Sequence, residues 1–232
     1  MTNGLAGEVT YEKVLTTEET WKPGARKIEV VLQPIYGEGI YYPWIYPYGP
    51  IPEIPEIVPR SVVIDIETTG PEPYDSRIIT IGVVDIRNPE NIISFTNEDE
   101  ELMVKEFIAW FELNGFDEII GYNVSFDYRF IFAKLLRYRL PSKAFMDADL
   151  YDVMQMMKQA KMAFVFGYNK PGTLEQWAAY LFGEKKILTF EEILIAWEEE
   201  RIYDIIKHNK HDVELCLMLW ALIKYVQGEI SA

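Results

Sequence analysis

The sequence lacks the features of secreted, disulfide-bonded and membrane proteins. Its one cysteine, Cys216, excludes an intrachain disulfide and a cysteine-based zinc site. No apolar run approaches the roughly 20 residues that a membrane-spanning helix needs. The N-terminal residues MTNGLAGEVTYEK do not have the basic and then apolar layout of a secretory signal. We therefore expect a soluble intracellular protein that does not associate with a membrane.

Positive charge is also scarce. The 232 residues carry a formal net charge of −15, whereas proteins that bind polyanions are usually basic. The charge is uneven, since residues 129–170 contain eight basic and three acidic side chains. This window is either a surface for a phosphate backbone or a set of solvated helix faces. The overall acidity argues against extended nucleic-acid binding, but not against a small site whose bound metal ions supply positive charge.

Residues 1–59 differ in composition from the rest of the chain. The stretch from Tyr36 to Pro59 is crowded with Tyr, Pro, Gly and Ile, and each proline removes a backbone donor and fixes φ. We expect an extended arm, with a strand at Lys27–Gln33, that lies on the main domain or on a partner. A free linker would leave many aromatic side chains exposed. The arm is a candidate for homodimerisation, and the main domain is expected over residues 60–232.

The main domain is predicted to be an α/β fold. Three β-branched runs with short links, at 61–66, 77–86 and 91–96, predict an antiparallel meander. Helical spacing of apolar residues and a capping box at Thr173–Gln176 predict further elements. These are helices at 100–113, 125–138, 173–183, 190–201 and 203–226, a strand at 118–122 and an acidic and apolar segment at 147–158. This order implies a mixed sheet, antiparallel and then parallel, flanked by helices.

Two carboxylates close the first predicted strand. Asp65 and Glu67 are two residues apart, so their side chains share one face of a strand. They repel each other there, and no Arg or Lys lies nearby in the sequence to compensate. A divalent cation relieves this repulsion, because hard cations prefer carboxylate oxygen. The alternative is that the strand ends at Asp65 and both acids face water.

Two more acids lie on predicted helices. Asp127 is in a first turn, where the helix dipole alone would favour an acid. Asp212 lies one turn after His208 on a stripe that is otherwise apolar, and an unpaired buried carboxylate costs several kcal/mol. A metal shared with the first two acids would satisfy Asp212, and so would a buried Asp–His pair. His211 is about 100° around the helix from this stripe and is expected at the surface.

Three segments together resemble the exonuclease motifs of the DEDD superfamily, and most of all the proofreading domains of family-B DNA polymerases and their stand-alone relatives. The segments are VVIDIETTG (62–70), GYNVSFDYRFIFAKL (121–135) and HNKHDVEL (208–215). The segment LEQWAAYLFGEKK (174–186) is similar to the helix that precedes the third motif in such domains. The resemblance covers about residues 60–226 and implies an RNase H-like fold.

The resemblance also implies a two-metal mechanism with Mg²⁺ or Mn²⁺. Asp65, Glu67 and Asp212 would bind the first cation, Asp65 would bridge to the second, and Asp127 would hold the second. Asn123 and Phe126 would position the terminal nucleotide. Thr68 is a further candidate for substrate binding. Weaker candidates for stacking on a base are Tyr122, Phe164 and Tyr168.

The chain departs from the family pattern at one position. A tyrosine usually stands four residues before the last aspartate, and here that residue is His208. In the histidine-type branch the histidine stands five residues before, where this chain has Lys207. His208 is a candidate general base, because the usual pKa of histidine, about 6.5, suits proton transfer near neutrality.

We therefore expect a metal-dependent 3′–5′ exonuclease that acts on 3′ ends of single strands, with DNA favoured over RNA. The chain ends soon after the third motif, so we expect a stand-alone nuclease or a subunit that works beside a polymerase. The arm would then bind a polymerase or replication partner. Two alternatives are a non-catalytic nuclease-like subunit that binds nucleic-acid ends or scaffolds a replication or repair complex, and an exoribonuclease that trims RNA.

Overall fold

The computed structural model describes residues 60–159, 166–167 and 170–230. The expected arm at 1–59, with its strand at 27–33, lies outside the described residues, as do the stacking candidates Phe164 and Tyr168. Within the part that the structure describes, no helix combines the length and the apolar character needed to cross a bilayer.

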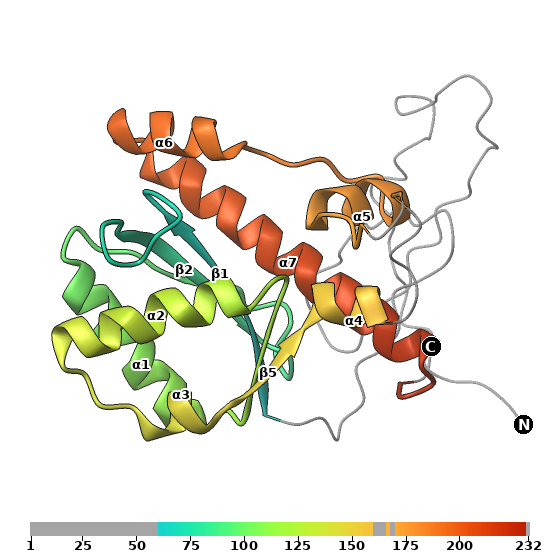
Figure 1. The fold of residues 1–232 in the computed structure, drawn as a ribbon, viewed down its shortest axis with the longest axis horizontal. Helices are drawn as coiled ribbons and strands as arrows, with labels where there is room; N and C mark the ends of the chain where they lie inside the picture. Colours follow the sequence, from blue (N-terminus) through green and yellow to red (C-terminus); the bar gives the residue numbers. More distant parts are fainter. Residues whose placement is uncertain (1–59, 160–165, 168–169, 231–232) are drawn as a thin grey trace, which may run out of the picture. The chain divides into compact units, whose positions relative to one another are not determined.

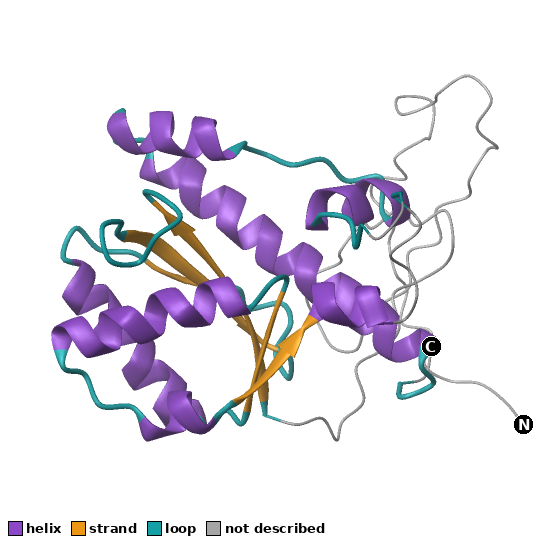
Figure 2. Ribbon diagram, viewed as in Figure 1, coloured by secondary structure: helices purple, strands orange, loops and turns teal. Residues whose placement is uncertain are grey.

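A five-stranded mixed sheet forms the centre of the described residues (Figure 2). Its strands are β1 (Ser61–Thr68), β2 (Ile78–Asp85), β3 (Ile93–Phe95), β4 (Glu118–Gly121) and β5 (Asp149–Asp152), in the order β3-β2-β1-β4-β5. The first three strands pair antiparallel, as the short links predicted. β4 pairs parallel with β1, and β5 pairs parallel with β4. The expected meander followed by parallel strands is confirmed.

The helices lie on both faces of this sheet (Figure 1). They are α1 (Glu100–Asn114), α2 (Ser125–Tyr138), α3 (Lys143–Asp147), α4 (Val153–Gln159), α5 (Leu174–Leu181), α6 (Phe190–Glu198) and α7 (Ile202–Val226). The predicted capping box opens α5, where the Thr173 hydroxyl accepts from Gln176 N and the Gln176 side chain accepts from Thr173 N. A second capping box, between Thr189 and Glu192, opens α6.

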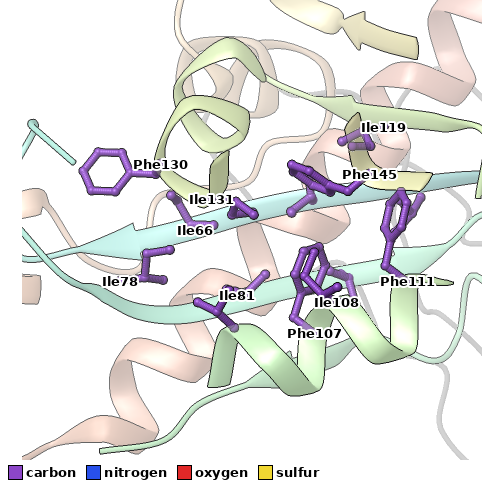
Figure 3. Packing of buried hydrophobic residues seen from close by; sticks show 14 of the residues in the cluster. Ile66, Ile78, Ile81, Phe107, Ile108, Phe111, Ile119, Phe130, Ile131 and Phe145 are labelled. Carbon is purple, nitrogen blue, oxygen red and sulfur yellow. The ribbon is translucent and has the colours of Figure 1, made fainter. Parts of the chain in front are cut away.

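Strand β1 is buried on both faces, and its alternating side chains enter two different cores. Val62, Ile64 and Ile66 pack with α1, α2 and α3, in the aromatic-rich cluster that Figure 3 shows. Val63 faces the other way and packs in the cluster formed with α4, α5 and α7. Because strand side chains alternate, the positions that follow Val63 on its own face are 65 and 67. The strand therefore presents both of its carboxylates to α7.

Candidate active site

Asp65 and Glu67 lie inside β1, which continues to Thr68. Glu67 is buried and Asp65 is half-buried. The alternative in which the strand ends at Asp65 and both acids face water is therefore wrong. The predicted shared face is confirmed, and it brings two carboxylates together in a largely buried place.

Asp127 is joined to the same strand through a backbone hydrogen bond. β4 pairs with β1 only from Ser61 to Val63, so the edge of β1 beyond Val63 has no strand partner there. Ile66 N, between the two acids of β1, donates to Asp127 Oδ1 at 3.0 Å. The Asp127 carboxylate thus accepts the hydrogen bond that a neighbouring strand would otherwise accept. It lies in the first turn of α2, as predicted, but the dipole of that helix does not account for its contact with β1.

Helix α7 brings His208 and Asp212 to the carboxylates of β1. His208 Nε2 lies 3.3 Å from Glu67 Oε1 and 3.6 Å from Asp212 Oδ2. Ligand atoms of these three residues all lie within 4.8 Å of one another, an arrangement that fits a metal ion. The His208 side chain is only 1% exposed. The contact between His208 and Asp212, one of the two explanations offered for Asp212, is present, and Glu67 joins it.

One pocket of ≈ 180 Å³ gathers seven of the eight site residues predicted from the sequence. Thr68, the eighth, lines a neighbouring pocket of ≈ 280 Å³. The residues that line the first pocket are Asp65, Ile66, Glu67, Tyr122, Asn123, Phe126, Asp127, Lys186, Phe190, Ile193, His208 and Asp212. The two pockets share Ile66, Glu67, Phe126 and Phe190.

Burial changes the pKa values of these groups. Loss of hydration raises the pKa of Glu67 and of Asp127 to about 8 and that of Asp212 to about 6. The pKa of Asp65 is raised well above its usual value by burial and then by the neighbouring carboxylates. Burial lowers the pKa of His208 to about 4, so its imidazole is neutral near pH 7. A divalent cation would replace protons at these carboxylates, so the donor set fits one or two such ions.

Lys186 brings a positive charge to the pocket that the four carboxylates line. It lies between α5 and α6, far from β1 in the sequence, and its Nζ is 2.9 Å from Glu175 Oε1. Its charge lowers the pKa of both Glu67 and Asp212, against the larger effect of burial. No Arg or Lys lies near Asp65 in the sequence, but Lys186, from a distant segment, partly compensates the negative charge of the site. One lysine does not balance four acids.

Asn209 is a buried site residue that the sequence argument missed. Its Nδ2 donates to the Asp65 carbonyl oxygen at 3.0 Å and to Asp65 Oδ2 at 2.8 Å. Gly82 pairs with Asp65 across β1 and β2, and a Cβ at Gly82 would lie 2.2 Å from Asn209 Oδ1. The glycine therefore makes the space that Asn209 occupies. A glycine inside the apolar run IITIGVVD was the available signal.

Replacing Gly82 with alanine is expected to destabilise the protein by about 1–3 kcal/mol, because the added methyl group overpacks the space held by Asn209. Thermal unfolding of the metal-free protein measures this change. The double variant Gly82→Ala/Asn209→Ala is expected to recover part of the loss, since it removes the nearest clashing atom. Equal melting temperatures of Gly82→Ala and wild type would show that the contact is not tight.

The neighbouring pocket has aromatic side chains suited to a nucleotide base. Phe126 is half-buried, with Phe130 at 4.9 Å between ring centroids and the Arg129 guanidinium 5.6 Å from its own ring. Phe190, the first residue of α6, is 41% exposed and was not predicted. Its position at a helix start far from the three motifs gave no signal. The two rings offer base contacts that do not depend on sequence.

The other predicted binding residues have partners within the protein. Asn123 adopts a left-handed conformation with φ 63°, which asparagine tolerates, and its N–H donates to Asp152 Oδ1 at 3.1 Å. The exposed Asn123 side chain remains beside the pocket. The Thr68 hydroxyl donates to the Gly70 carbonyl oxygen, and the Tyr122 hydroxyl donates to that of Gly172. Thr68 and Tyr122 therefore have no free hydroxyl donor for a substrate, although their oxygen atoms can still accept.

Two expectations about surface residues are corrected. The His211 side chain is only 14% exposed, with Nδ1 3.8 Å from Glu214 Oε2. Burial on α7 is not confined to one stripe, since the successive residues 215–221 are all buried. Lys134, in the basic window, is 1% exposed, pairs with Glu100 at 3.2 Å and donates to the Ser76 carbonyl oxygen. Lys134 therefore cannot contribute to a surface for a phosphate backbone.

Comparison with known proteins gives three findings. A sequence profile of the RNase H superfamily matches residues 62–227. An uncharacterised protein of Methanocaldococcus jannaschii is 37% identical over 85 residues, which are 37% of this chain and 47% of that protein. The family B DNA polymerase of the hyperthermophilic archaeon Pyrobaculum calidifontis is similar in fold, with a TM-score of 0.58 and 16% identity over 70% of this chain and 24% of the polymerase chain. The chain spans less than half of either protein.

Proposed function

This chain belongs to the RNase H superfamily, which confirms the fold class expected from its sequence, and we propose that it is a metal-dependent 3′–5′ exonuclease of the DEDD type. Its proposed substrates are single-stranded 3′ ends, with DNA favoured. The observation that carries the proposal is the convergence of four carboxylates, from β1, α2 and α7, on one pocket. A purely structural role does not account for four carboxylates in one pocket whose lining contains a single lysine.

The carboxylates divide into two overlapping sets. Asp65, Glu67 and Asp212 are proposed to hold one cation, and Asp65 and Asp127 the other. Asp127 retains Oδ2 for this role, because Oδ1 accepts from Ile66 N. Two divalent cations, Mg²⁺ or Mn²⁺, would supply activation of the attacking water and stabilisation of the leaving 3′-oxygen. Asn209 would position Asp65, whose carboxylate it already orients.

The pocket of ≈ 280 Å³ beside the carboxylates is proposed to receive the terminal base. This volume is at the lower end of small-molecule sites, so it suits one nucleotide rather than a segment of duplex. Phe126 and Phe190 would contact the base, Thr68 would line the pocket, and Asn123 would contact the backbone. Nothing in this set reads a base edge in a fixed pattern, which supports an activity independent of sequence.

The test is a nuclease assay on matched single-stranded DNA and RNA oligonucleotides with Mg²⁺ or Mn²⁺. A 3′ label is expected to leave at once as a mononucleotide, while a 5′ label gives a ladder of shortening products. EDTA is expected to abolish both signals, and a circular single strand is expected to remain intact because it has no end. Cleavage of the circle would contradict the exonuclease assignment.

The same assay separates the alternatives. Faster loss of nucleotides from RNA than from DNA would favour an exoribonuclease, because such discrimination requires contacts to the 2′-hydroxyl. Binding of the oligonucleotides without any metal-dependent cleavage would favour a nuclease-like binding or scaffold subunit. The arm at 1–59 is proposed to join a second copy or a polymerase or replication partner, and the mass in solution of a variant without residues 1–59 tests the first of these.

His208 completes the proposed centre. The neutral imidazole has a lone pair that can take a proton or a cation, and the expected role as general base stays a prediction.

A further inference from the structure

His208 presents one nitrogen to two carboxylates and leaves the other without a partner. Nε2 faces Glu67 Oε1 at 3.3 Å and Asp212 Oδ2 at 3.6 Å. Nδ1 is buried and has no hydrogen-bond partner among the residues that the structure describes. Among those residues, no carboxylate or carbonyl group therefore accepts from Nδ1, as the partner that orients a general base would. With its side chain 1% exposed, the imidazole is fixed by packing and directed at the two acids.

The three facing atoms have the spacing of metal ligands. An ion with bonds of about 2.0–2.2 Å keeps any two of its ligand atoms within about 4.4 Å of each other. The two distances from His208 Nε2 are already below this limit, and all three ligand atoms lie within 4.8 Å of one another. Only small side-chain movements would bring Glu67, His208 and Asp212 onto one ion. The pocket into which they project gives such an ion access to solvent.

We propose that His208 Nε2 is a direct ligand of the cation held by Glu67 and Asp212, and that this site takes Mn²⁺ or a later first-row transition ion in preference to Mg²⁺. The chemistry follows from the donor atoms, since Mg²⁺ prefers an all-oxygen environment whereas imidazole suits transition metals. The proposal rests on the proposed function and refines it. One position would be mixed nitrogen and oxygen, and the position at Asp65 and Asp127 would have oxygen ligands only.

The chain provides its own control, because it has two histidines and both lie on α7. His211 is one turn from Glu214 and its Nε2 is buried without a partner among the described residues. The variants His208→Gln and His211→Gln each remove one imidazole and keep a polar side chain. Their melting temperatures in EDTA establish that each is folded before any metal is added.

The experiment measures metal binding to the full chain without substrate. Pulsed electron paramagnetic resonance of bound Mn²⁺ is expected to show coupling to an imidazole ¹⁴N in wild type and in His211→Gln, and no such coupling in His208→Gln. The preference for Mn²⁺ over Mg²⁺, measured by competition, is expected to fall about tenfold or more in His208→Gln. Visible absorption of bound Co²⁺ gives a second reading of the same change.

Three results would overturn the proposal. Mn²⁺ bound without ¹⁴N coupling in wild type would remove His208 from the ligand set and leave the exonuclease proposal standing. Coupling lost in His211→Gln but kept in His208→Gln would show that His211, and not His208, is the ligand. Absence of a resonance signal from bound Mn²⁺, together with melting temperatures that neither Mn²⁺ nor Mg²⁺ raises, would overturn this proposal and the proposed function together.

Discussion

Replacing Asp65 with asparagine is expected to lower the rate of nucleotide release about 1000-fold or more at saturating Mn²⁺. Asp65 is the carboxylate shared by both proposed cation positions, and loss of several kcal/mol of charge stabilisation corresponds to a rate change of this size. The fold is expected to persist, because the asparagine side-chain oxygen can still accept from Asn209 Nδ2 at the place of Asp65 Oδ2. Single-turnover rates on a 5′-labelled oligonucleotide measure the loss.

The same variant is expected to be more stable than wild type in EDTA by about 1 kcal/mol, because asparagine removes the cost of burying an acid at this position and then its repulsion by the neighbouring carboxylates. Activity and stability would then change in opposite directions, which simple damage to the fold cannot produce. Glu106→Gln, an exposed acid on α1, is the matched control and is expected to keep both properties. An Asp65→Asn protein with near wild-type rates would remove Asp65 from the centre.

The metal-free protein is expected to lose stability as the pH rises from 6.5 to 8. Glu67 and Asp127 have folded pKa values of about 8, above their usual values, so they stabilise the folded state below those usual values and lose this contribution as the pH rises through 8. His208 acts oppositely, but its contribution changes only between its usual pKa of 6.5 and its folded pKa of about 4. Above pH 6.5 the carboxylates therefore dominate.

The expected loss is about 3 kcal/mol over this range, or roughly 6–12 °C in melting temperature. Saturating Mn²⁺ or Mg²⁺ is expected to reverse the slope, since metal binding displaces protons and strengthens as the pH rises. The nearby Glu214 carboxylate raises the pKa of His211, which contributes in the same direction, so the scan is made in the His211→Gln background. Adding Glu67→Gln and Asp127→Asn should flatten the slope, and an unchanged slope would contradict the assignment.

The sequence was sufficient for the parts of the site that lie within continuous segments. Alternation along β1 placed Asp65 and Glu67 on one face, and helical spacing placed His208 and Asp212 on one stripe. These patterns are local, and local geometry determines which side chains share a face. The fold class followed from the order of strands and helices, which short links and β-branched runs already restrict.

The residues that were missed depend on packing between segments far apart in the sequence. Asn209, on α7, contacts Asp65, on β1, only because Gly82, on the neighbouring β2, has no side chain. Phe190 and Lys186 come from segments whose direction is set by the packing of α5 and α6, and not by any motif. The contact of Asp127 with Ile66 N depends on where β4 stops, which the sequence pattern located only to within a residue. Such features require the tertiary structure.

The early end of β4 has a consequence for how this fold can vary. A parallel strand extended past Gly121 would satisfy Ile66 N with its own carbonyl group and would occupy the edge on which Asp127 now lies. Insertions that lengthen β4 therefore compete with the site, whereas the opposite side of the sheet, at β3, is free of this competition. Because β4 is shorter than β1, the Ile66 N–H has no partner in a neighbouring strand, and it is this N–H that holds the Asp127 carboxylate.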